Sequence, residues 1–362
     1  MHSVVAALVP PQLVFWFIRD MRLLILSHVG DIHSKVTARA LVGLGVDSEI
    51  FCFDEFPIAS TITYDLTSTG PILRGPEADA RLCTFDTVWN RRGWDPVFSA
   101  ELDARDKQLA GPICRRFADE MRLSPPTDQL WINPRAAQLA MRSKAVQLRL
   151  AREIGFTIPR TIISNDVGAI RSFLSGPGEF IVKSIAPMSW TEDGAVVALP
   201  TTGIRLEQIV DEVSVQSCPM IYQERIEKSY ELRVVVFGNR TLWVKLHSQE
   251  GSRYRDDWRQ GILTEMRVEP VAPPDRLEPL ILEFCRRANL LHASFDIAIS
   301  PDGSAIFFEV NEQGQTLWIE EVNPEIRVLD MLVRFLADPL GRGSEPLRGE
   351  RLQLADHLPL AA

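Results

Sequence analysis

The chain has 362 residues, 46% of them hydrophobic, which is enough to bury the cores of two or three packed subdomains. Its 39 Lys and Arg residues face 48 Asp and Glu residues, and the resulting net charge of −9 argues against a nucleic acid as partner. The five cysteines are scattered, odd in number and without a CxxC pair, so they predict neither disulfides nor a zinc site and fit a reduced, cytoplasmic protein.

Residues 1–20 form an apolar N-terminal extension that contains Pro10 and Pro11 in the middle of the run. The extension lacks a basic start and is too short for a membrane span, so we expect neither a signal peptide nor a membrane partner. We interpret it either as a disordered arm or as a start-site artefact, because Met21 directly opens a buried-strand pattern.

An N-terminal α/β domain is predicted over residues 21–128. RLLILS (22–27), a helical stretch around 35–44 and SEIFCFD (48–54) predict strand, helix and strand, which is a parallel βαβ unit. An irregular region to about residue 80 is followed by a strand, FDTVWNRR (85–92), and by a helix over roughly 96–121. The Pro-rich SPPTD (124–128) marks the domain boundary.

We expect the rest of the chain to form a central subdomain (129–221), a C-terminal subdomain (222–340) and a tail (341–362). One helix should run from Pro134 to Ile154, with Asn133 as its cap. The other expected elements are, in chain order, a loop and strand in 155–166, a central strand in 178–186, strands in 220–226, 231–238 and 241–248, and a helix over 279–288.

A hairpin near the C-terminus carries the main functional signal. HASFDIAIS and AIFFEVN flank Pro301–Ser304, whose central Asp-Gly is the preferred two-residue type I′ turn. That turn predicts that Asp296 lies opposite Glu309. It also predicts two further opposed pairs, Ile299 with Ile306 and Ile297 with Phe308.

The alternation of side chains gives this hairpin one apolar face and one polar face. The apolar face consists of Phe295, Ile297, Ile299, Ile306, Phe308 and Val310. The polar face contains Ser294, Asp296, Ala298, Phe307, Glu309 and Asn311. Two carboxylates and an amide oxygen are therefore expected at one end of the hairpin.

Directly opposed carboxylates repel each other, and burying them is costly unless a proton or a cation intervenes. Mg²⁺ prefers oxygen ligands, keeps several waters and is commonly completed by substrate phosphates. We therefore predict a magnesium site at Asp296, Glu309 and Asn311. The alternative from the same residues is a solvated acidic face on a surface hairpin.

The run FFEVNEQGQ (307–315), downstream of the strand with Asp296, resembles the metal-binding end of ATP-grasp ligases, where an acid and E-x-N hold magnesium. QERI (223–226), ELR (231–233) and the segment 132–161 resemble the hinge, the following strand and the central-domain entry of the RimK-like branch. Within that branch, the Asn-Pro start, VWNRR (88–92) and EVNEQGQTLWIEE (309–321) are most similar to microviridin-type graspetide maturases. The matches cover about residues 130–330.

This resemblance implies an α/β fold, of the α+β ATP-grasp type, in which central and C-terminal subdomains clasp the nucleotide behind an N-terminal pre-ATP-grasp domain. It implies ATP and Mg²⁺ as cofactors, activation of a carboxylate as an acyl phosphate, and capture by a nucleophile. The implied partner is a precursor peptide with a leader and a core that contains Asp or Glu together with Ser, Thr or Lys. A homodimer is also implied.

The resemblance assigns a nucleotide-binding role to six residues, which are Lys144, Lys183, Gln223, Glu224, Ile226 and Glu231. The two lysines would contact phosphates, the residues 223, 224 and 226 would form the adenine-binding hinge, and the last glutamate would accept hydrogen bonds from ribose. Arg233 and Arg259 would stabilise charge on the phosphate or acyl phosphate, because a guanidinium donates two parallel hydrogen bonds.

The residues alone leave alternatives open for several of these positions. Lys183 is compatible with an edge lysine that extends into water, and Lys144 with a solvated helix face. Arg259 could form a surface salt bridge with a neighbouring aspartate. Arg91 and Arg92 are compatible with an acidic peptide or with a solvated strand end.

The chain departs from many ATP-grasp enzymes in the segment 184–196, which contains a single glycine, Gly194, where a glycine-rich phosphate lid is common. A longer, peptide-dependent lid or closure by side chains would follow. Three functions are compatible with the whole pattern. They are a ligase that crosslinks a ribosomal peptide, a RimK-like ligase that adds amino acids to a carboxylate, and an inactive nucleotide-binding regulator.

Overall fold

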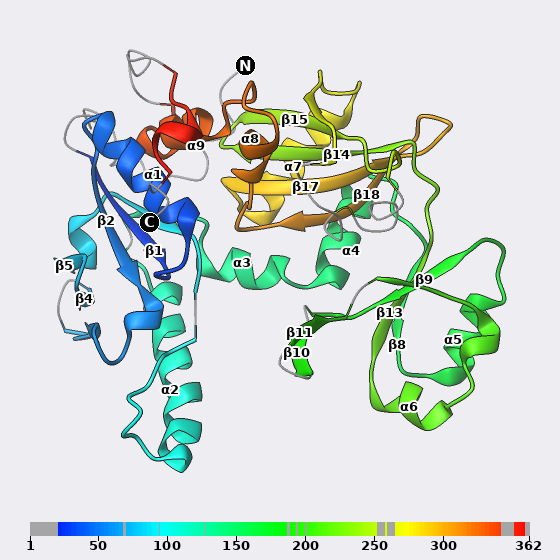
Figure 1. The fold of residues 1–362 in the computed structure, drawn as a ribbon, viewed down its shortest axis with the longest axis horizontal. Coiled ribbons are helices and arrows are strands. Elements are labelled where there is room, and N and C mark those ends of the chain that lie inside the picture. The colour runs from blue at the N-terminus through cyan, green and yellow to red at the C-terminus, as the bar shows by residue number, and fades with distance from the viewer. Residues whose placement is uncertain are drawn as a thin grey trace.

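The computed structural model describes residues 21–67, 70–93, 95–126, 128–186, 189–192, 195–199, 201–251, 258, 265–341 and 351–358. The expected N-terminal extension, residues 1–20, lies outside these ranges. Within them, the strands form five sheets, of which three are large enough to organise the molecule (Figure 1). No helix in the described ranges is long and apolar enough to cross a membrane.

The N-terminal sheet is parallel, as predicted, and has the strand order β2-β1-β6-β7. Its strands are β1 (Arg22–Ser27), β2 (Asp47–Cys52), β6 (Thr87–Asn90) and β7 (Leu130–Ile132). Helix α1 (Ile32–Gly43) connects β1 to β2, which confirms the βαβ unit, and α2 (Ala104–Leu123) connects β6 to β7. Residues 23–26 of β1 are fully buried because both faces of this strand are covered.

The region expected to be irregular contains a small antiparallel sheet of β3 (Thr61–Thr63), β4 (Ile72–Gly75) and β5 (Ala78–Arg81). The expectation was wrong because each strand has only three or four residues, which is too short for a periodic pattern. Helix α2 also begins later than predicted, at the residue after Asp103, whose side chain accepts a hydrogen bond from the Arg105 amide.

The predicted helix from Pro134 to Ile154 is two helices, α3 (Arg135–Met141) and α4 (Lys144–Ile154). The Ser143 hydroxyl accepts a hydrogen bond from the Val146 amide and so caps a second helix start. The predicted cap, Asn133, has another role. Its side-chain amide donates to the carbonyls of His292 and Glu312, at 2.7 and 2.6 Å, and thereby ties the start of α3 to the C-terminal sheet.

A second sheet has the order β12-β9-β13-β8. It consists of β8 (Thr161–Ser164), β9 (Phe180–Lys183), β12 (Thr202–Ile204) and β13 (Met220–Glu224), so the predicted central strand is confirmed as interior. Helices α5 (Val167–Leu174) and α6 (Glu212–Ser217) accompany it. The segment expected to act as a lid forms the antiparallel pair β10 (Ser189–Glu192) and β11 (Ala195–Ala198), which projects from this sheet (Figure 1).

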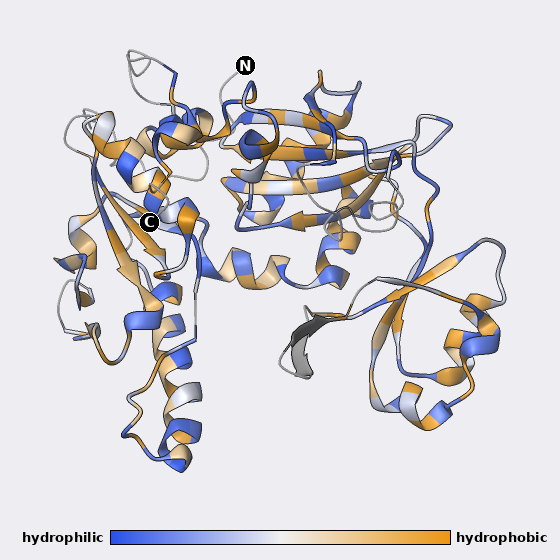
Figure 2. Cartoon of the chain, in the orientation of Figure 1, coloured by the Kyte–Doolittle hydropathy of each residue, from blue (hydrophilic) through white to orange (hydrophobic). Residues whose placement is uncertain are grey.

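The C-terminal sheet is antiparallel with the order β16-β15-β14-β17-β18. Its strands are β14 (Tyr230–Phe237), β15 (Arg240–Leu246), β16 (Val268–Pro270), β17 (His292–Ile299) and β18 (Ala305–Asn311). Figure 2 shows hydrophobic residues (orange) along its strands, with hydrophilic residues (blue) between them. Both faces are covered: Val234 and Val236 of β14 belong to the core with α7 (Leu277–Ala288), whereas Val235 and Phe237 belong to the core with α9 (Val328–Ala337).

The second of these cores joins the sheets, because α9 also packs against α1 of the N-terminal sheet. A short helix, α8 (Trp318–Val322), leads from β18 towards α9. In the expected tail, Leu354 lies in a 3₁₀ helix (Leu354–Asp356) and is buried in the same core. The N-terminal and C-terminal sheets therefore share one hydrophobic core, whereas the sheet with β9 has its own.

The hairpin of β17 and β18 pairs Asp296 with Glu309, as predicted. The predicted two-residue turn is wrong, since Ile299 pairs with Ala305 and Ile297 pairs with Phe307. A β-bulge at Phe308 shifts the register by one residue between the turn and the acids. As a result Phe307 is fully buried in the core, and Phe308 is only half-buried.

Candidate active site

Three charged side chains form a row across the polar face of the C-terminal sheet. Asp296 on β17 lies opposite Arg233 on β14 and, on its other side, opposite Glu309 on β18. The side chains of all three residues point away from the core with α7, because the residues on either side of Asp296 in β17 are buried in that core. The sheet register therefore brings together three of the residues predicted from the sequence.

Each carboxylate of the row is paired with a cationic side chain. Arg233 Nη1 lies 2.7 Å from Asp296 Oδ1, and these side chains are only 3% and 4% exposed. Lys144 Nζ lies 2.5 Å from Glu309 Oε2, with the two side chains 24% and 14% exposed. The two pairs relieve the repulsion between the opposed acids, and the alternative of a solvated acidic surface is wrong for Asp296.

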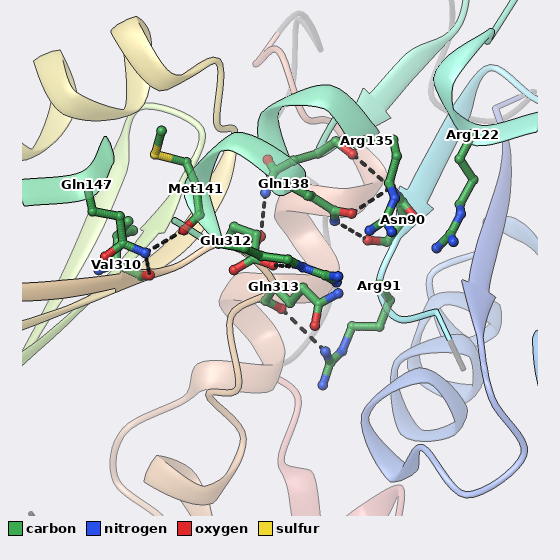
Figure 3. Close-up of polar contacts among 12 residues, drawn as sticks. Asn90, Arg91, Arg122, Arg135, Gln138, Met141, Gln147, Val310, Glu312 and Gln313 are labelled. Atoms are coloured by element: carbon green, nitrogen blue, oxygen red, sulfur yellow. Dashed lines mark hydrogen bonds and ion pairs between the residues drawn. The ribbon is translucent and has the colours of Figure 1, made fainter. Parts of the chain in front are cut away.

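Lys144 reaches Glu309 because α4 is fixed along the outer edge of β18. Gln147, one turn further along α4, donates to the Val310 carbonyl at 2.9 Å and accepts from the Val310 amide at 3.0 Å (Figure 3). This side chain satisfies backbone groups of an edge strand that would otherwise need another strand. The solvated-helix alternative for Lys144 is therefore wrong.

The oxygen ligands of this edge suit a hard divalent cation. Asn311 adds an amide whose nitrogen lies 3.4 Å from Glu309 Oε1, so its side chain belongs to the same cluster. No group of three His, Cys, Asp or Glu side chains that could enclose a metal is found among the described residues. Two carboxylates and one amide instead match Mg²⁺, which uses few protein ligands together with water and phosphate oxygens.

The second sheet holds another pair of predicted residues. Lys183 Nζ on β9 donates to Gln223 Oε1 on β13 at 2.9 Å, and the Gln223 amide donates to Thr161 Oγ1 at 2.8 Å. Lys183 lies half-buried on an interior strand, so the edge-strand alternative is wrong. Glu224 contacts Arg160, and Ile226 lies half-buried in the segment that connects this sheet to β14.

Glu231 is a buried acid to which the resemblance assigns ribose binding. Burial raises the pKa of Glu231, and the opposing effect comes mainly from Lys228. Lys228 Nζ lies 2.8 Å from Glu231 Oε1, and both side chains are 5% exposed. Sequence reasoning missed Lys228, because a single lysine in a loop carries no periodic signal.

Arg259 lies outside the described residues. Its neighbour Trp258 is buried and stacks on Trp318, with ring centroids 4.8 Å apart. The Arg233 guanidinium carbon lies 5.7 Å from the centroid of the Trp258 ring. The two tryptophans therefore belong to the core shared with the N-terminal sheet, and the Trp258 ring lies against the Arg233 guanidinium.

The alternative of a solvated strand end is wrong for Arg91, which is fully buried. Its Nε lies 3.5 Å from Asp31 Oδ2, and its Nη1 donates to the Gln313 carbonyl at 3.5 Å. Figure 3 shows this contact beside the Asn90–Gln138 hydrogen bonds that hold the end of β6 against α3. The segment after β18 is thus attached to the N-terminal sheet.

Gly314 explains the glycine of the E-x-N-x-x-G pattern. Its φ is +51°, and a Cβ at this position would collide with the ring of His292. The ring cannot retreat, because it is buried and its Nδ1 is 2.8 Å from the Val236 carbonyl. We predict that Gly314→Ala lowers the free energy of unfolding by about 2–4 kcal/mol, measured by urea denaturation. A loss below about 0.5 kcal/mol would contradict this packing.

His292 also predicts a pH dependence of stability. Burial lowers the pKa of His292 to about 4, whereas an unfolded histidine titrates near 6.5. Between these values the unfolded chain binds the extra proton, so stability falls as the pH drops from about 6.5 to about 4, by up to about 1.4 kcal/mol per pH unit.

The measurement is urea denaturation of the wild-type chain and of His292→Gln at pH 7 and pH 5. We expect the variant to lose less stability than the wild type over this interval. His357→Gln, at a half-exposed histidine, serves as the control and should keep the wild-type difference. Equal pH dependence of His292→Gln and the wild type would show that His292 does not titrate this way.

No protein-family model matches the sequence, and no curated protein is similar to it. Solved structures match most of the chain. A RiPP-associated ATP-grasp ligase of Chryseobacterium gregarium, in complex with ADP and a leader and core peptide, has a TM-score of 0.80 at 25% identity, covering 92% of this chain and 99% of that one. The macrocyclase MdnC of Microcystis aeruginosa, bound with precursor peptide MdnA, has a TM-score of 0.77 at 23% identity, covering 88% and 100%.

A third match is the ATP-grasp ligase PsnB, complexed with a precursor variant, Mg and ADP, at a TM-score of 0.68 and 17% identity, covering 88% of this chain and 98% of that one. The chain therefore has the ATP-grasp fold, as the sequence predicted. Within this fold it is similar to RiPP-associated ligases and macrocyclases, which confirms the resemblance that rested on the Asn-Pro start, VWNRR and EVNEQGQTLWIEE.

Proposed function

We propose that this chain is an ATP- and magnesium-dependent ligase that matures a ribosomal precursor peptide by forming macrocyclic ester or amide crosslinks between its side chains. The observation that carries the proposal is the row of Arg233, Asp296 and Glu309, completed by Lys144 from α4. It combines oxygen ligands for a hard cation with fixed cations for a phosphoryl group. The similarity to ligases solved with ADP and peptide supports the same assignment.

In this proposal the row serves phosphoryl transfer from ATP. Asp296, Glu309 and Asn311 would hold Mg²⁺, which would neutralise phosphate charge and polarise the transferred group. Lys144 supplies a further phosphate contact, because its ammonium already lies against a metal ligand. Arg233 stabilises the acyl phosphate, which it can do because Asp296 and Trp258 fix its guanidinium.

The nucleotide would lie between the C-terminal sheet and the sheet with β9. Lys183, held by Gln223, contacts phosphate in this proposal, while Glu224 and Ile226 bind the adenine from the connecting segment. Glu231 accepts from the ribose, and Arg259 supports Arg233. The same proposal includes the N-terminal domain 21–128, the central subdomain 129–221 and the C-terminal subdomain 222–340. It also includes a homodimer and a cytoplasmic location.

The chemistry requires two steps. A side-chain carboxylate of the peptide attacks the γ-phosphorus of ATP, which releases ADP and gives an acyl phosphate. A hydroxyl or amino side chain of the same peptide then displaces phosphate at the acyl carbon and loses a proton. The peptide loses one water for each crosslink formed.

The test is to incubate the protein with ATP, Mg²⁺, a mixture of free amino acids and the short peptide encoded beside its gene, followed by mass spectrometry. We expect a product lighter by one water per crosslink, together with equal amounts of ADP and phosphate. A non-hydrolysable ATP analogue serves as the control and should leave the peptide unchanged. A product heavier by an amino acid would favour RimK-like ligation, and ATP binding without turnover with any candidate peptide would favour an inactive regulator.

A further inference from the structure

A second charged site lies in the N-terminal part of the molecule. A pocket of about 300 Å³ is lined by residues of α2, of α3 and of the segments that follow β2 and β6. Four arginines line it, and they are Arg115, Arg122, Arg135 and Arg142. Its volume is at the lower end of the range for small-molecule sites, roughly 300–1,000 Å³, which suits a single side chain.

The deep part of the pocket holds more positive than negative charge. Arg122 Nη2 and Arg135 Nε share a single acceptor, Asp119 Oδ1, at 2.6 and 2.8 Å. Both arginines are 6% exposed, and the Nη1 atom of each is buried without a hydrogen-bond partner among the described residues. Two buried guanidinium groups thus depend on one carboxylate, which is costly unless a further anion arrives.

The other two arginines of the pocket each have an acidic partner of their own. Arg115 pairs with Asp95 at 3.2 Å, and Arg142 pairs with Glu312 at 3.2 Å. Both arginine side chains are about half exposed, in contrast to the buried Arg122 and Arg135. Burial, followed by the charge of Arg135, lowers the pKa of Arg122 to about 10, which agrees with an excess of positive charge.

The remaining wall is apolar, which narrows the chemistry of the ligand. Phe53 and Phe56 are buried side chains of this wall, and the Arg122 guanidinium lies 4.7 Å from the centroid of the Phe53 ring. A carboxylate at the end of a short methylene chain would contact both walls at once. A guanidinium also binds a carboxylate through two parallel hydrogen bonds.

The pocket adjoins the candidate magnesium site through two consecutive ion pairs. Arg142 and Lys144 flank the junction of α3 and α4. Arg142 pairs with Glu312, just after the end of β18, and Lys144 pairs with Glu309, near the end of that strand. Figure 3 shows Glu312 and Gln313 beside α3, between this sheet edge and the N-terminal arginines. A side chain held in the pocket would therefore lie near the segment that follows β18.

We propose that this pocket binds the carboxylate of a glutamate side chain in the precursor peptide, at a residue other than the one being activated. The inference rests on the proposed function for the identity of its ligand. The glutamate completes the charge of Arg122 and Arg135 and holds the peptide core in a fixed position relative to Glu309.

The experiment titrates three ligands into the full chain, without ATP or peptide, and follows the melting temperature. The ligands are N-acetyl-glutamate N-methylamide, the neutral glutamine analogue and inorganic phosphate. We expect saturable stabilisation by the glutamate analogue alone, and affinity at least about tenfold weaker in Arg122→Gln and in Arg135→Gln. Arg116→Gln is the matched control, because Arg116 lies on α2 but pairs with Glu120 at the exposed surface.

Several results would overturn the assignment. They are equal stabilisation by the glutamine analogue, stabilisation by phosphate instead of the glutamate analogue, or unchanged affinity in the two arginine variants. If neither variant folds, the comparison of the three ligands on the wild-type chain still decides. Because the assay contains no ATP, its failure leaves the ligase proposal intact, whereas a missing peptide product would count against that proposal alone.

A second readout uses the peptide that the ligase assay identifies. Arg122→Gln should raise the KM for this peptide at least about tenfold and leave kcat within about twofold, because the pocket binds without touching the reacting atoms. Arg116→Gln should change neither constant. An equal fall in kcat and kcat/KM in Arg122→Gln would instead place the arginine in the chemical step and overturn the anchoring role.

Discussion

Glu309→Gln should abolish ATP-dependent turnover while the protein stays folded. The substitution keeps the shape of the side chain and an oxygen that can accept from Lys144, but it removes the charge that would bind Mg²⁺. Because the Lys144 side chain is 24% exposed and keeps an oxygen partner, we expect little loss of stability. The rate of ADP release should fall by at least about 100-fold.

The matched control for this change is Glu269→Gln. Glu269 also forms an ion pair with a lysine of the same sheet, at 3.6 Å from Lys245, but it lies on β16, at the opposite edge from β18. We expect turnover within about twofold of the wild type. Turnover of Glu309→Gln within a few-fold of the wild type would exclude Glu309 as a metal ligand.

Arg233→Met should be the most destabilising single change in the site. It removes the guanidinium that pairs with Asp296 where both side chains are almost completely buried. Breaking a buried ion pair from one side costs about 3–5 kcal/mol, because a charge stays behind without its partner. Guanidinium denaturation should show this loss, and ATP turnover should disappear with it.

The double change Arg233→Met with Asp296→Leu separates stability from chemistry. Apolar replacement of both partners should recover at least half of the lost stability, yet turnover should stay absent because both functional groups are gone. Arg267→Met is the control, since Arg267 and Glu250 form an exposed pair that contributes less than about 1 kcal/mol. An active double variant would exclude the pair from the chemistry, and a single variant as stable as the wild type would exclude its contribution to stability.

The pairing of Asp296 with Glu309 was predicted from the register of a two-residue turn, and it is correct although that turn is not the one in the structure. The same argument failed for Phe307 and Phe308, since a bulge inserts one residue into β18 and no residue type announces it. Asp296 still pairs with Glu309 because two shifts cancel. The actual turn shifts the pairing by one residue, and the bulge at Phe308 shifts it back before the acids.

The cations of the site were less accessible to sequence reasoning. Lys144 was placed in the middle of one long helix, whereas it begins α4, where Ser143 caps the new helix and Gln147 fixes it to β18. These contacts join residues more than 160 positions apart, and no local pattern encodes them. The pocket of Arg122 and Arg135 was missed for the same reason, because α2 and α3 meet only in the folded chain.

The most direct test of the metal assignment is a crystal structure with ADP and Mn²⁺, in which anomalous scattering locates the ion. We expect an anomalous peak within coordination distance of the carboxylates of Asp296 and Glu309 and the amide oxygen of Asn311, in contact with a nucleotide phosphate. A peak elsewhere, with Lys144 still paired with Glu309 and Arg233 still paired with Asp296, would contradict the proposed active site.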